Sequence, residues 1–387
     1  MIRSSDRVSE IKPYYFATKL KAIAALNASG ADIINLGIGS PDLPPPALAL
    51  ETLTDSLKVN AAHQYQSYYG LPALRQSIID FYERYLDTHV NGIDHVLPLI
   101  GSKEGIMHIS MAYLNPGDQV LVPNPGYPSY ASCTQLAGGE PVYYNLTADN
   151  GWSPDIEALR SLDLTRVKLM WINSPHMPTG AVIPQETLEA LVAFAHEHSI
   201  LLCHDNPYAF ILNEEPTSLL SIPQAESCVV ELLSMSKAFN MSGWRVGAVI
   251  GTPRLLDPII RFKSNMDSGM FKPVQLAAAA ALRSDQSWFD SLNATYRKRK
   301  QIAYNILDSI NCKYTTDQSG MFVWAKHDTL SGREVSDKVL DESRVFITPG
   351  FIFGDQGSDY VRVSLCSPID RLEAAHQRII TSNTKRV

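Results

Sequence analysis

Short apolar segments alternate with helix-like segments through most of this 387-residue chain, and this alternation constrains its fold more than any other feature. The apolar segments carry little polar alternation, as expected of strands that are buried on both faces of a sheet. Strands that alternate with helices predict an α/β layer fold. The six strands expected in the central part are His95–Ile100, Gln119–Pro123, Val167–Ile172, Ile200–His204, Cys228–Leu233 and Arg245–Ile250.

Helices are expected between these strands, and proline marks the start of two of them. Ser153 and Pro154 are the residue types of an N-cap and a first-turn proline, for a helix that runs to Leu162. Pro184 opens a second helix, whose apolar residues recur on one face.

The part of the chain beyond Ser284 predicts a second, smaller α/β unit. A long amphipathic helix is expected there first, followed by strands near Met321–Ala325, Val345–Thr348 and Tyr360–Leu365. A chain of this length exceeds one usual core. We therefore predict a large domain over residues 46–284 and a small domain over residues 285–387, which packs with the N-terminal segment 1–45.

Charge and composition favour small-molecule chemistry. The net charge of -7, without any basic block, argues against a nucleic-acid surface. The longest strongly apolar run, Leu276–Leu282, is far shorter than the roughly 20 residues of a membrane span. The five cysteines are widely spaced and form no C-x-x-C pair, so neither a disulfide framework nor a metal site is expected. Together with an N-terminus that lacks an apolar core, these features predict a cytoplasmic protein.

A polar loop presents Lys237 directly after the strand that ends at Leu233. An enzyme that binds an aldehyde cofactor needs one amine, desolvated so that its pKa falls and the neutral nucleophile is available. A neighbouring phosphate needs hydroxyls and a guanidinium fork, and Ser234, Ser236 and Arg245 are the right types. Because the alternative, a solvated lysine in a surface turn, does not account for these neighbours, we interpret Lys237 as a catalytic amine.

Polar residues also follow two preceding strands. Asp205 lies at the end of one strand, where a carboxylate can face a protonated pyridine nitrogen, and Tyr208 can donate to a phenolic oxygen. A helix-capping aspartate and a packing tyrosine are the alternative. Asn173 ends the strand before, in a segment that is otherwise a proline and glycine turn. Open α/β sheets bind ligands at such strand ends, so we expect Asn173, Asp205 and Lys237 to meet.

Three other segments can complete a binding site. The loop before the helix that starts at Ser102 and Lys103 can bind phosphate through free amides. Tyr127 can stack on a flat ring or pack in the core, and these readings have equal weight. Arg362 lies within an apolar strand and needs a carboxylate partner, either from the protein or from a substrate.

Taken together, these segments resemble the class I/II aminotransferases, which are fold-type I enzymes that depend on pyridoxal 5′-phosphate. The resemblance extends from Ile33–Asp42 to Val361–Ser364. It implies a large domain with a mostly parallel sheet between helices, and a smaller α/β domain formed by both chain ends. It also implies that Lys237 carries the cofactor as a Schiff base, that Asp205 pairs with the pyridine nitrogen, and that Tyr208 bonds the phenolic oxygen.

The same resemblance implies roles for the remaining positions. The matching residues would bind an α-amino acid and a 2-oxo acid in turn, through pyridoxamine phosphate. Tyr127 matches the aromatic residue that stacks on the ring, Gly39 and Arg362 match the groups that hold the substrate α-carboxylate, and Asn173 is expected beside the cofactor. Tyr65 matches a tyrosine that reaches the phosphate of the other subunit, which implies a two-fold dimer with shared active sites. The phosphate would be held by Ser102, Lys103, Ser234, Ser236 and Arg245.

One position departs from the family pattern. Met177 stands where the family normally has an asparagine that bonds the phenolic oxygen, and a thioether donates no hydrogen bond. Tyr208 would then be the main donor unless Asn173 or His176 substitutes. We expect activity with an altered pH dependence.

The amino donor stays open between two classes. The segments Gly101–His108 and Asn124–Pro128 are similar to those of LL-diaminopimelate aminotransferases. Tyr68 and Tyr69 lie where those proteins often carry an acidic residue, and Tyr14–Phe16 can favour an apolar or aromatic side chain. Two other functions are alternatives on the same scaffold, namely a C–S β-lyase and a non-catalytic regulator that binds pyridoxal phosphate.

Overall fold

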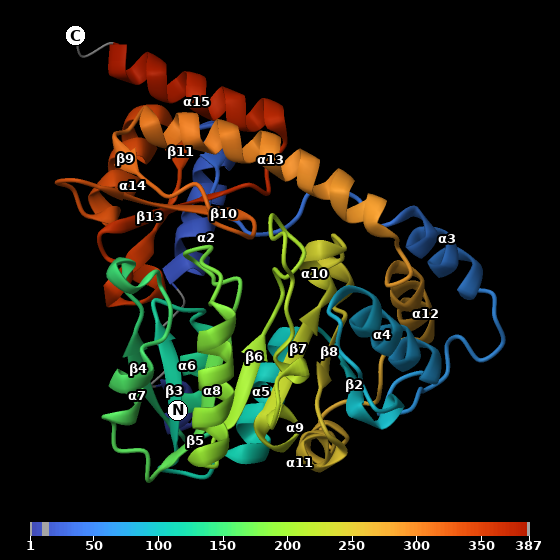
Figure 1. Cartoon of the computed structure of the whole chain (residues 1–387). Helices are drawn as coiled ribbons and strands as arrows, with labels where there is room; N and C mark the ends of the chain where they lie inside the picture. The colour runs from blue at the N-terminus through green and yellow to red at the C-terminus, as the bar shows by residue number, and fades with distance from the viewer. Residues whose placement is uncertain (1, 10–14, 385–387) are drawn as a thin grey trace.

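The computed structural model describes residues 2–9 and 15–384, and its larger part is built on a seven-stranded sheet (Figure 1). The strand order is β2-β8-β7-β6-β5-β3-β4. Strand β8 is antiparallel to both β2 and β7, and the other neighbours run parallel. The strands are β2 (Val96–Leu99), β3 (Gln119–Asn124), β4 (Glu140–Asn145), β5 (Val167–Asn173), β6 (Leu201–Asp205), β7 (Val229–Ser234) and β8 (Gly247–Ile250).

All six strands predicted for this region are present, and no end differs from the prediction by more than two residues. Arg245 lies outside β8 because its φ of 56° is left-handed, and the strand begins after it. Sequence reasoning missed β4. This strand pairs only with β3, is partly exposed and contains Pro141. An edge strand of this kind lacks the continuous apolar run by which the others were recognised.

Helices cover both faces of this sheet (Figure 1). On one face α5 (Ser102–Tyr113), α6 (Ser129–Leu136) and α11 (Pro253–Lys263) contribute to one apolar cluster. On the other, α7 (Ile156–Arg160) and α8 (Gln185–Glu197) contribute to a second.

The predicted start of α7 was wrong. Ser153 is not its N-cap, because the side chain of Asp155 accepts the bond from the Ala158 amide and the helix starts after it.

The smaller part combines the two ends of the chain. Its antiparallel sheet has the order β12-β13-β10-β9, and β1 (Ile34–Asn35) pairs in parallel with β11 (Val345–Phe346). The strand expected near Val345–Thr348 is therefore two short strands in different sheets. The long helix expected after Ser284 is α13 (Gln286–Asp308), which crosses the top of the molecule in Figure 1. The other strands are β9 (Cys312–Lys313), β10 (Phe322–His327), β12 (Thr348–Pro349) and β13 (Tyr360–Ser364).

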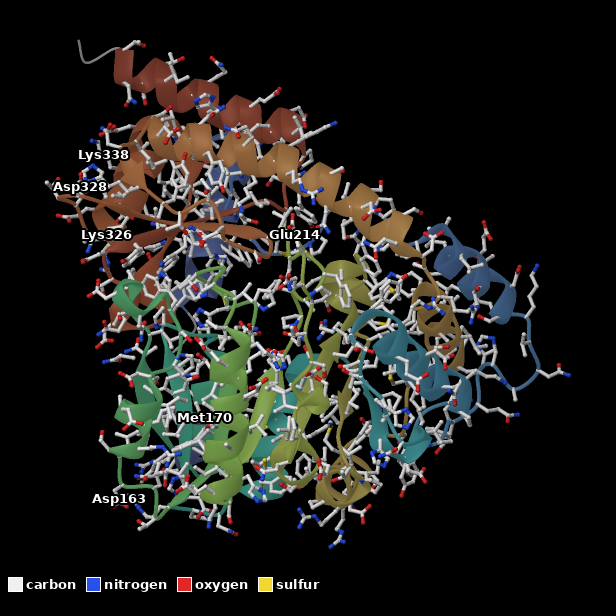
Figure 2. All side chains as sticks on the ribbon, in the orientation of Figure 1. Asp163, Met170, Glu214, Lys326, Asp328 and Lys338 are labelled. Carbon is white, nitrogen blue, oxygen red and sulfur yellow. The ribbon has the colours of Figure 1, made fainter. Side chains whose placement is uncertain are left out.

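The side chains divide as the apolar pattern predicts. In Figure 2, Met170 lies inside the sheet region, whereas Asp328 and Lys338 lie at the outer edge of the smaller part. Across the described residues, no helix combines the length and apolar character needed to cross a membrane. The remaining α-helices are α1 (Asp6–Ser9), α2 (Tyr15–Ala28), α3 (Ala47–Ser56), α4 (Pro72–Tyr85), α9 (Ala225–Cys228), α10 (Met235–Ala238), α12 (Lys272–Ala281), α14 (Gly332–Ser343) and α15 (Ile369–Thr384).

Candidate active site

A cavity of about 270 Å³ lies at the carboxyl ends of β5, β6 and β7. Asn173 is the last residue of β5, Asp205 is the last of β6, and Lys237 lies in α10 directly after β7. The expectation that these three residues meet is confirmed, because all of them line the cavity. The complete lining is Ser102, Lys103, Tyr127, Tyr130, Asn173, Met177, Asp205, Pro207, Tyr208, Ser234, Ser236, Lys237, Ser242 and Arg245.

One end of the cavity is suited to an anion. Ser102 and Lys103 open the twelve-residue helix α5, whose first amides and dipole favour negative charge. The Arg245 guanidinium contributes a positive charge there and donates to the Ser242 carbonyl at 3.0 Å. Gly101 has a φ of +86°, and a Cβ at this position would collide with Arg245. Glycine at 101 is therefore needed both for the turn and for the approach of the guanidinium.

Lys237 is a half-buried amine with limited solvation. Its Nζ donates to the Gly39 carbonyl at 2.6 Å. Burial lowers the pKa of Lys237, and the nearby positive charges of Arg362 and Arg245 lower it further. The neutral, nucleophilic amine is therefore more accessible at neutral pH than in a solvated lysine.

Asp205 is a buried carboxylate with one oxygen bonded and one available. The hydroxyl of Tyr130 donates to Oδ2 at 2.8 Å, and Asn173 Nδ2 donates to the Asp205 backbone carbonyl at 2.7 Å. No described residue bonds to Oδ1, although it is buried. Burial raises the pKa of Asp205 to about 6, and the bond from Tyr130 opposes that rise. A cationic donor at Oδ1 would satisfy this oxygen and favour the ionised form.

Aromatic residues form the walls of the cavity. Tyr208 is buried, and burial raises the pKa of its phenol, so the hydroxyl keeps its proton and can donate. Tyr127 is half-buried and meets Tyr130 edge-on, with ring centroids 5.6 Å apart. Tyr130 is in turn stacked on Trp171. This packing fixes the orientation of the Tyr130 hydroxyl toward Asp205.

Met177 occupies the place of the expected asparagine and bonds differently. Its Sδ accepts from Arg362 Nη1 at 3.2 Å, and its amide donates to Asn173 Oδ1 at 2.7 Å. The Asn173 side chain is thus bonded at both its oxygen and its nitrogen. His176 bonds to Thr179 and does not line the cavity. Neither Asn173 nor His176 therefore replaces the missing donor in the described structure.

Three predicted residues do not line the cavity. Gly39 and Arg362 adjoin it, since Gly39 accepts from Lys237 and Arg362 donates to Met177. The Arg362 guanidinium lies between two rings, 3.8 Å from the centroid of Phe322 and 4.6 Å from that of Phe353. Tyr65 is 90% exposed and lies apart from the cavity.

Sequence reasoning missed the contact of Tyr130 with Asp205 and the lining position of Ser242. Tyr130 lies in the same aromatic loop as Tyr127, which was the one available signal. Its partner is 75 residues away, so no local spacing indicates the bond.

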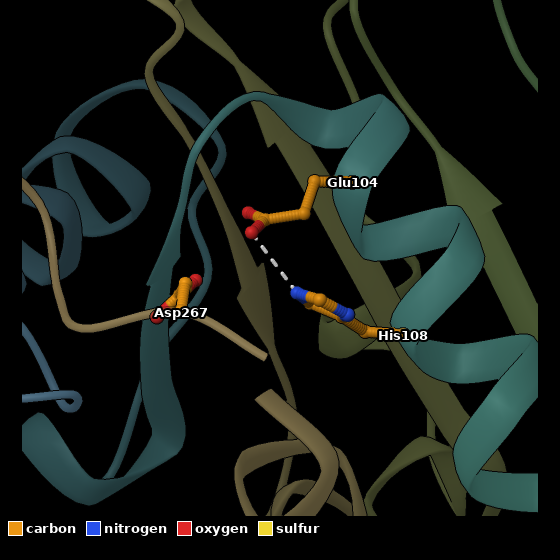
Figure 3. A group of neighbouring side chains, drawn as sticks. All are labelled: Glu104, His108 and Asp267. Atoms are coloured by element: carbon orange, nitrogen blue, oxygen red, sulfur yellow. Dashed lines mark ion pairs between the residues drawn. The ribbon is translucent and has the colours of Figure 1, made fainter. Parts of the chain in front are cut away.

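A separate cluster lies at the side of α5, with His108 beside Glu104 and Asp267 nearby (Figure 3). These are metal-ligand types, and His108 Nε2 is 3.0 Å from a Glu104 oxygen. The buried Lys263 ammonium, however, already pairs with Asp267. Because this lysine supplies the positive charge, we interpret the cluster as an ion-pair network rather than a metal centre.

The comparisons with known proteins agree over almost the whole chain. The family model described as aminotransferase class I and II matches residues 31–379. The chain belongs to this family. It is 41% identical to an LL-diaminopimelate aminotransferase of Desulforudis audaxviator, over 97% of this chain and 96% of the relative.

Solved structures give the same result for this aminotransferase. The apo structure of BacF from Bacillus subtilis superposes with a TM-score of 0.93 at 34% identity, covering 99% of both chains. An aspartate aminotransferase from Thermus thermophilus, solved with maleate, superposes with a TM-score of 0.91 at 26% identity and covers 99% of this chain and 100% of its own. The protein is therefore a fold-type I enzyme that uses pyridoxal 5′-phosphate to transfer an amino group from an amino acid to a 2-oxo acid.

The residues of the cavity fit this cofactor. The anion end suits its phosphate, the half-buried amine of Lys237 suits its aldehyde, and the unbonded Asp205 Oδ1 suits a protonated ring nitrogen. The resemblance predicted each of these residue types. The structure brings them to one cavity.

Proposed function

We propose that Lys237, Asp205 and Tyr208 form the catalytic centre of this aminotransferase. The observation that carries the proposal is their arrangement in one cavity, where a half-buried amine with a lowered pKa and a buried carboxylate with an unbonded oxygen line the same space. Perturbed ionisable groups within a cleft are typical of active sites.

Each residue has a separate task. Pyridoxal phosphate, when bound, supplies an electron sink that stabilises negative charge at the substrate Cα. Lys237 would hold the cofactor covalently through Nζ and, once released, would move a proton at the substrate Cα. Asp205 Oδ1 would hold a proton on the ring nitrogen, the Tyr208 hydroxyl would donate to the phenolic oxygen, and the Tyr127 ring would stack on the cofactor.

The charged groups orient the two ends of the ligands. Arg362 and Gly39 would bind the substrate α-carboxylate, and the aromatic rings on either side of Arg362 keep its planar fork in one orientation. Asn173 contributes by fixing the Asp205 backbone. The cofactor phosphate would be bound by Ser102, Lys103, Ser234, Ser236 and Arg245.

We also propose two domains and a homodimer. The proposed large domain spans residues 46–284, and the small domain spans residues 285–387 and packs with residues 1–45. Tyr65 would reach the phosphate of a second copy. Supporting this, several large apolar side chains of two segments are exposed, and exposed apolar patches mark interfaces. They are Ile38, Leu48, Leu50, Leu57, Val59, Tyr65, Tyr68, Tyr69, Met266 and Phe271.

Two observations favour different amino donors. The relatives named LL-diaminopimelate aminotransferase favour a diaminopimelate-like donor. The cavity favours an apolar or aromatic side chain, because Asp205 is the one carboxylate in its described lining and the distal ammonium of diaminopimelate would need another. Tyr68 and Tyr69 support the second donor class. Tyr15 contacts Phe351, Phe16 lies near Phe346, and Tyr14 lies outside the described residues.

One spectroscopic experiment tests the reaction and the donor. The absorption of the holoenzyme would be recorded while single amino acids, including LL-diaminopimelate, phenylalanine and leucine, are added without an acceptor. Conversion to the pyridoxamine form, reversed by 2-oxoglutarate, supports transfer and ranks the donors. Accumulation of pyruvate without conversion, when the added amino acid is cystathionine and the thiol leaves from its Cβ, would instead support the β-lyase. A Lys237→Ala variant with the same spectrum as wild type would refute the proposed role of Lys237.

A further inference from the structure

A second titratable pair lies directly behind Asp205, outside the cavity lining. His204 precedes Asp205 on β6, and Glu231 is its register partner on β7. Both side chains are completely buried. The His204 ring bonds on both sides: Nδ1 is 2.8 Å from Glu231 Oε2, and Nε2 is 3.2 Å from the backbone carbonyl of Ser174.

Both carboxylate oxygens of Glu231 are held as hydrogen-bond acceptors. Tyr82 donates its hydroxyl to Oε1 at 2.8 Å, and burial raises the pKa of that phenol, so Tyr82 keeps its proton. Oε2 accepts from the Ser218 hydroxyl at 3.1 Å and from the Leu219 amide at 3.0 Å. A carboxylate that accepts several hydrogen bonds is stabilised in its charged form and has no hydrogen of its own to donate.

Both ring nitrogens of His204 therefore face oxygens that can only accept. The Ser174 carbonyl has no hydrogen, so Nε2 must carry one. The Glu231 carboxylate has none either, so Nδ1 must carry one as well. A neutral imidazole can donate from one nitrogen only, and its other nitrogen would then face an acceptor across a buried contact, at the cost of a lost charge-assisted bond. The doubly protonated ring instead donates from Nδ1 to the Glu231 carboxylate and from Nε2 to the Ser174 carbonyl, so each of these four groups has a partner.

We infer that His204 is an imidazolium that acts as a positioning residue for the cofactor, keeping Asp205 ionised and fixing the Ser174 carbonyl at the start of the loop that follows β5. This inference rests on the proposed role of Asp205 as partner of the ring nitrogen. Such a partner must be ionised near neutral pH, whereas burial raises the pKa of Asp205, and His204 is among the neighbours that lower it again, to a net value of about 6.

The two charges of the His204–Glu231 pair do not act equally on Asp205. The positive ring is on β6, next to Asp205 in sequence, whereas the negative Glu231 is one strand further away on β7. The positive end is therefore nearer to Asp205, and charges interact strongly where water is excluded. The groups that bond to the ring come from β7 and from the loop after β5, and Tyr82 of α4 bonds to Glu231. Among these, Glu231 is the one charged group.

The second contact acts on the loop that bears Asn173 and Met177. The Ser174 carbonyl accepts from His204, and the Ser174 hydroxyl accepts from the Ile183 amide at 3.0 Å. Ser174 is thus fixed through both its backbone and its side chain. The adjacent Asn173 then bonds the Asp205 backbone. His204 consequently supports the carboxylate of Asp205 and the loop that faces it.

Nuclear magnetic resonance of the ¹⁵N-histidine-labelled holoenzyme tests the charge of the ring directly. The His204 signal would be assigned by its loss in His204→Gln. We expect both ring nitrogens to be protonated in the holoenzyme at neutral pH, and a neutral tautomer would overturn the inference. Glu231→Gln removes the negative partner and should convert the ring to a neutral tautomer. A ring that stays doubly protonated in this variant would also overturn the inference, since the amide NH₂ could then donate to Nδ1 and no negative charge would favour the second proton.

A second measurement follows the ring nitrogen of bound, ¹⁵N-labelled pyridoxal phosphate. In His204→Gln we expect that nitrogen to lose its proton at a pH about one unit lower than in wild type, a tenfold loss of proton affinity. His89→Gln is the matched control, because His89 pairs with Glu83 at the surface, and it should cause no change. If Asp205→Asn shifts the titration and His204→Gln does not, this inference fails alone. If Asp205→Asn has no effect, the proposed role of Asp205 fails.

Discussion

Replacing Asp205 by asparagine should make the protein without cofactor more stable at neutral pH. The buried carboxylate has its pKa raised from 3.8 to about 6, mainly by burial. The fold therefore favours the protonated form. This contribution to stability is complete below pH 3.8 and is lost as the pH rises through about 6. An asparagine has nearly the same shape, can still accept from Tyr130, and carries no charge at any pH.

The magnitude follows from the two pKa values. Each unit between them corresponds to about 1.4 kcal/mol, so holding the ionised carboxylate in the fold costs about 3 kcal/mol above pH 6. At pH 5 about half of that cost is present. The stability advantage of Asp205→Asn over wild type should thus grow by about 1.4 kcal/mol between pH 5 and pH 8. This change with pH does not depend on how well the amide itself packs.

Urea unfolding of the two apoproteins at both pH values provides the measurement. Asp341→Asn, at an exposed position on α14, is the control and should show no comparable change with pH. An Asp205→Asn advantage that is equal at pH 5 and pH 8 would refute the argument, because it would mean that the carboxylate is not destabilised by burial. With cofactor bound, wild type should instead be more stable than Asp205→Asn, because the variant loses the partner of the ring nitrogen.

Three other substitutions test separate contacts. Lys263→Met should lower the free energy of unfolding by roughly 3–5 kcal/mol, because it leaves the carboxylate of Asp267 without its buried partner, and urea denaturation would show it. Tyr130→Phe should raise the pKa of Asp205 by about 1–2 units, the equivalent of one hydrogen bond to a charged group, as followed by the infrared carboxyl band of the apoprotein. Met177→Asn adds a donor beside Tyr208 and should move the pH midpoint of the holoenzyme absorption to lower pH, and an unchanged midpoint would contradict the role given to Met177.

The parts of the fold that sequence predicts are those governed by local pattern. The strands that end at Asn173 and Asp205 are runs that consist mostly of apolar residues, and parallel neighbours must end at the same edge of the sheet, so their polar ends meet. The edge strand β4 lacks such a run and was missed. The start of α7 was misplaced because Ser153, Pro154 and Asp155 are all acceptable near a helix start, and only the backbone shows which one caps it.

The site likewise has features that the sequence predicts and contacts that it does not. Residue types at strand ends indicated an amine, a carboxylate and an anion site. The bond of Tyr130 to Asp205 and that of His204 to Glu231 join residues 75 and 27 positions apart, and no periodicity connects them. The contact of Met177 with Arg362 likewise depends on how β13 lies against the loop that follows β5. Tertiary packing decides these bonds, so a single sequence does not indicate them.

The pairing of β1 with β11 has a consequence for the synthesis of the chain. Ile34 emerges from the ribosome early, but its partner Val345 follows about 310 residues later. At the usual 5–20 residues per second, β1 waits roughly 15–60 s for its partner. All strands of the large sheet have been made by Ile250, well before then. The nascent chain thus carries a formed sheet and an unpaired leading strand at the same time, and that strand is the part a chaperone would need to shield.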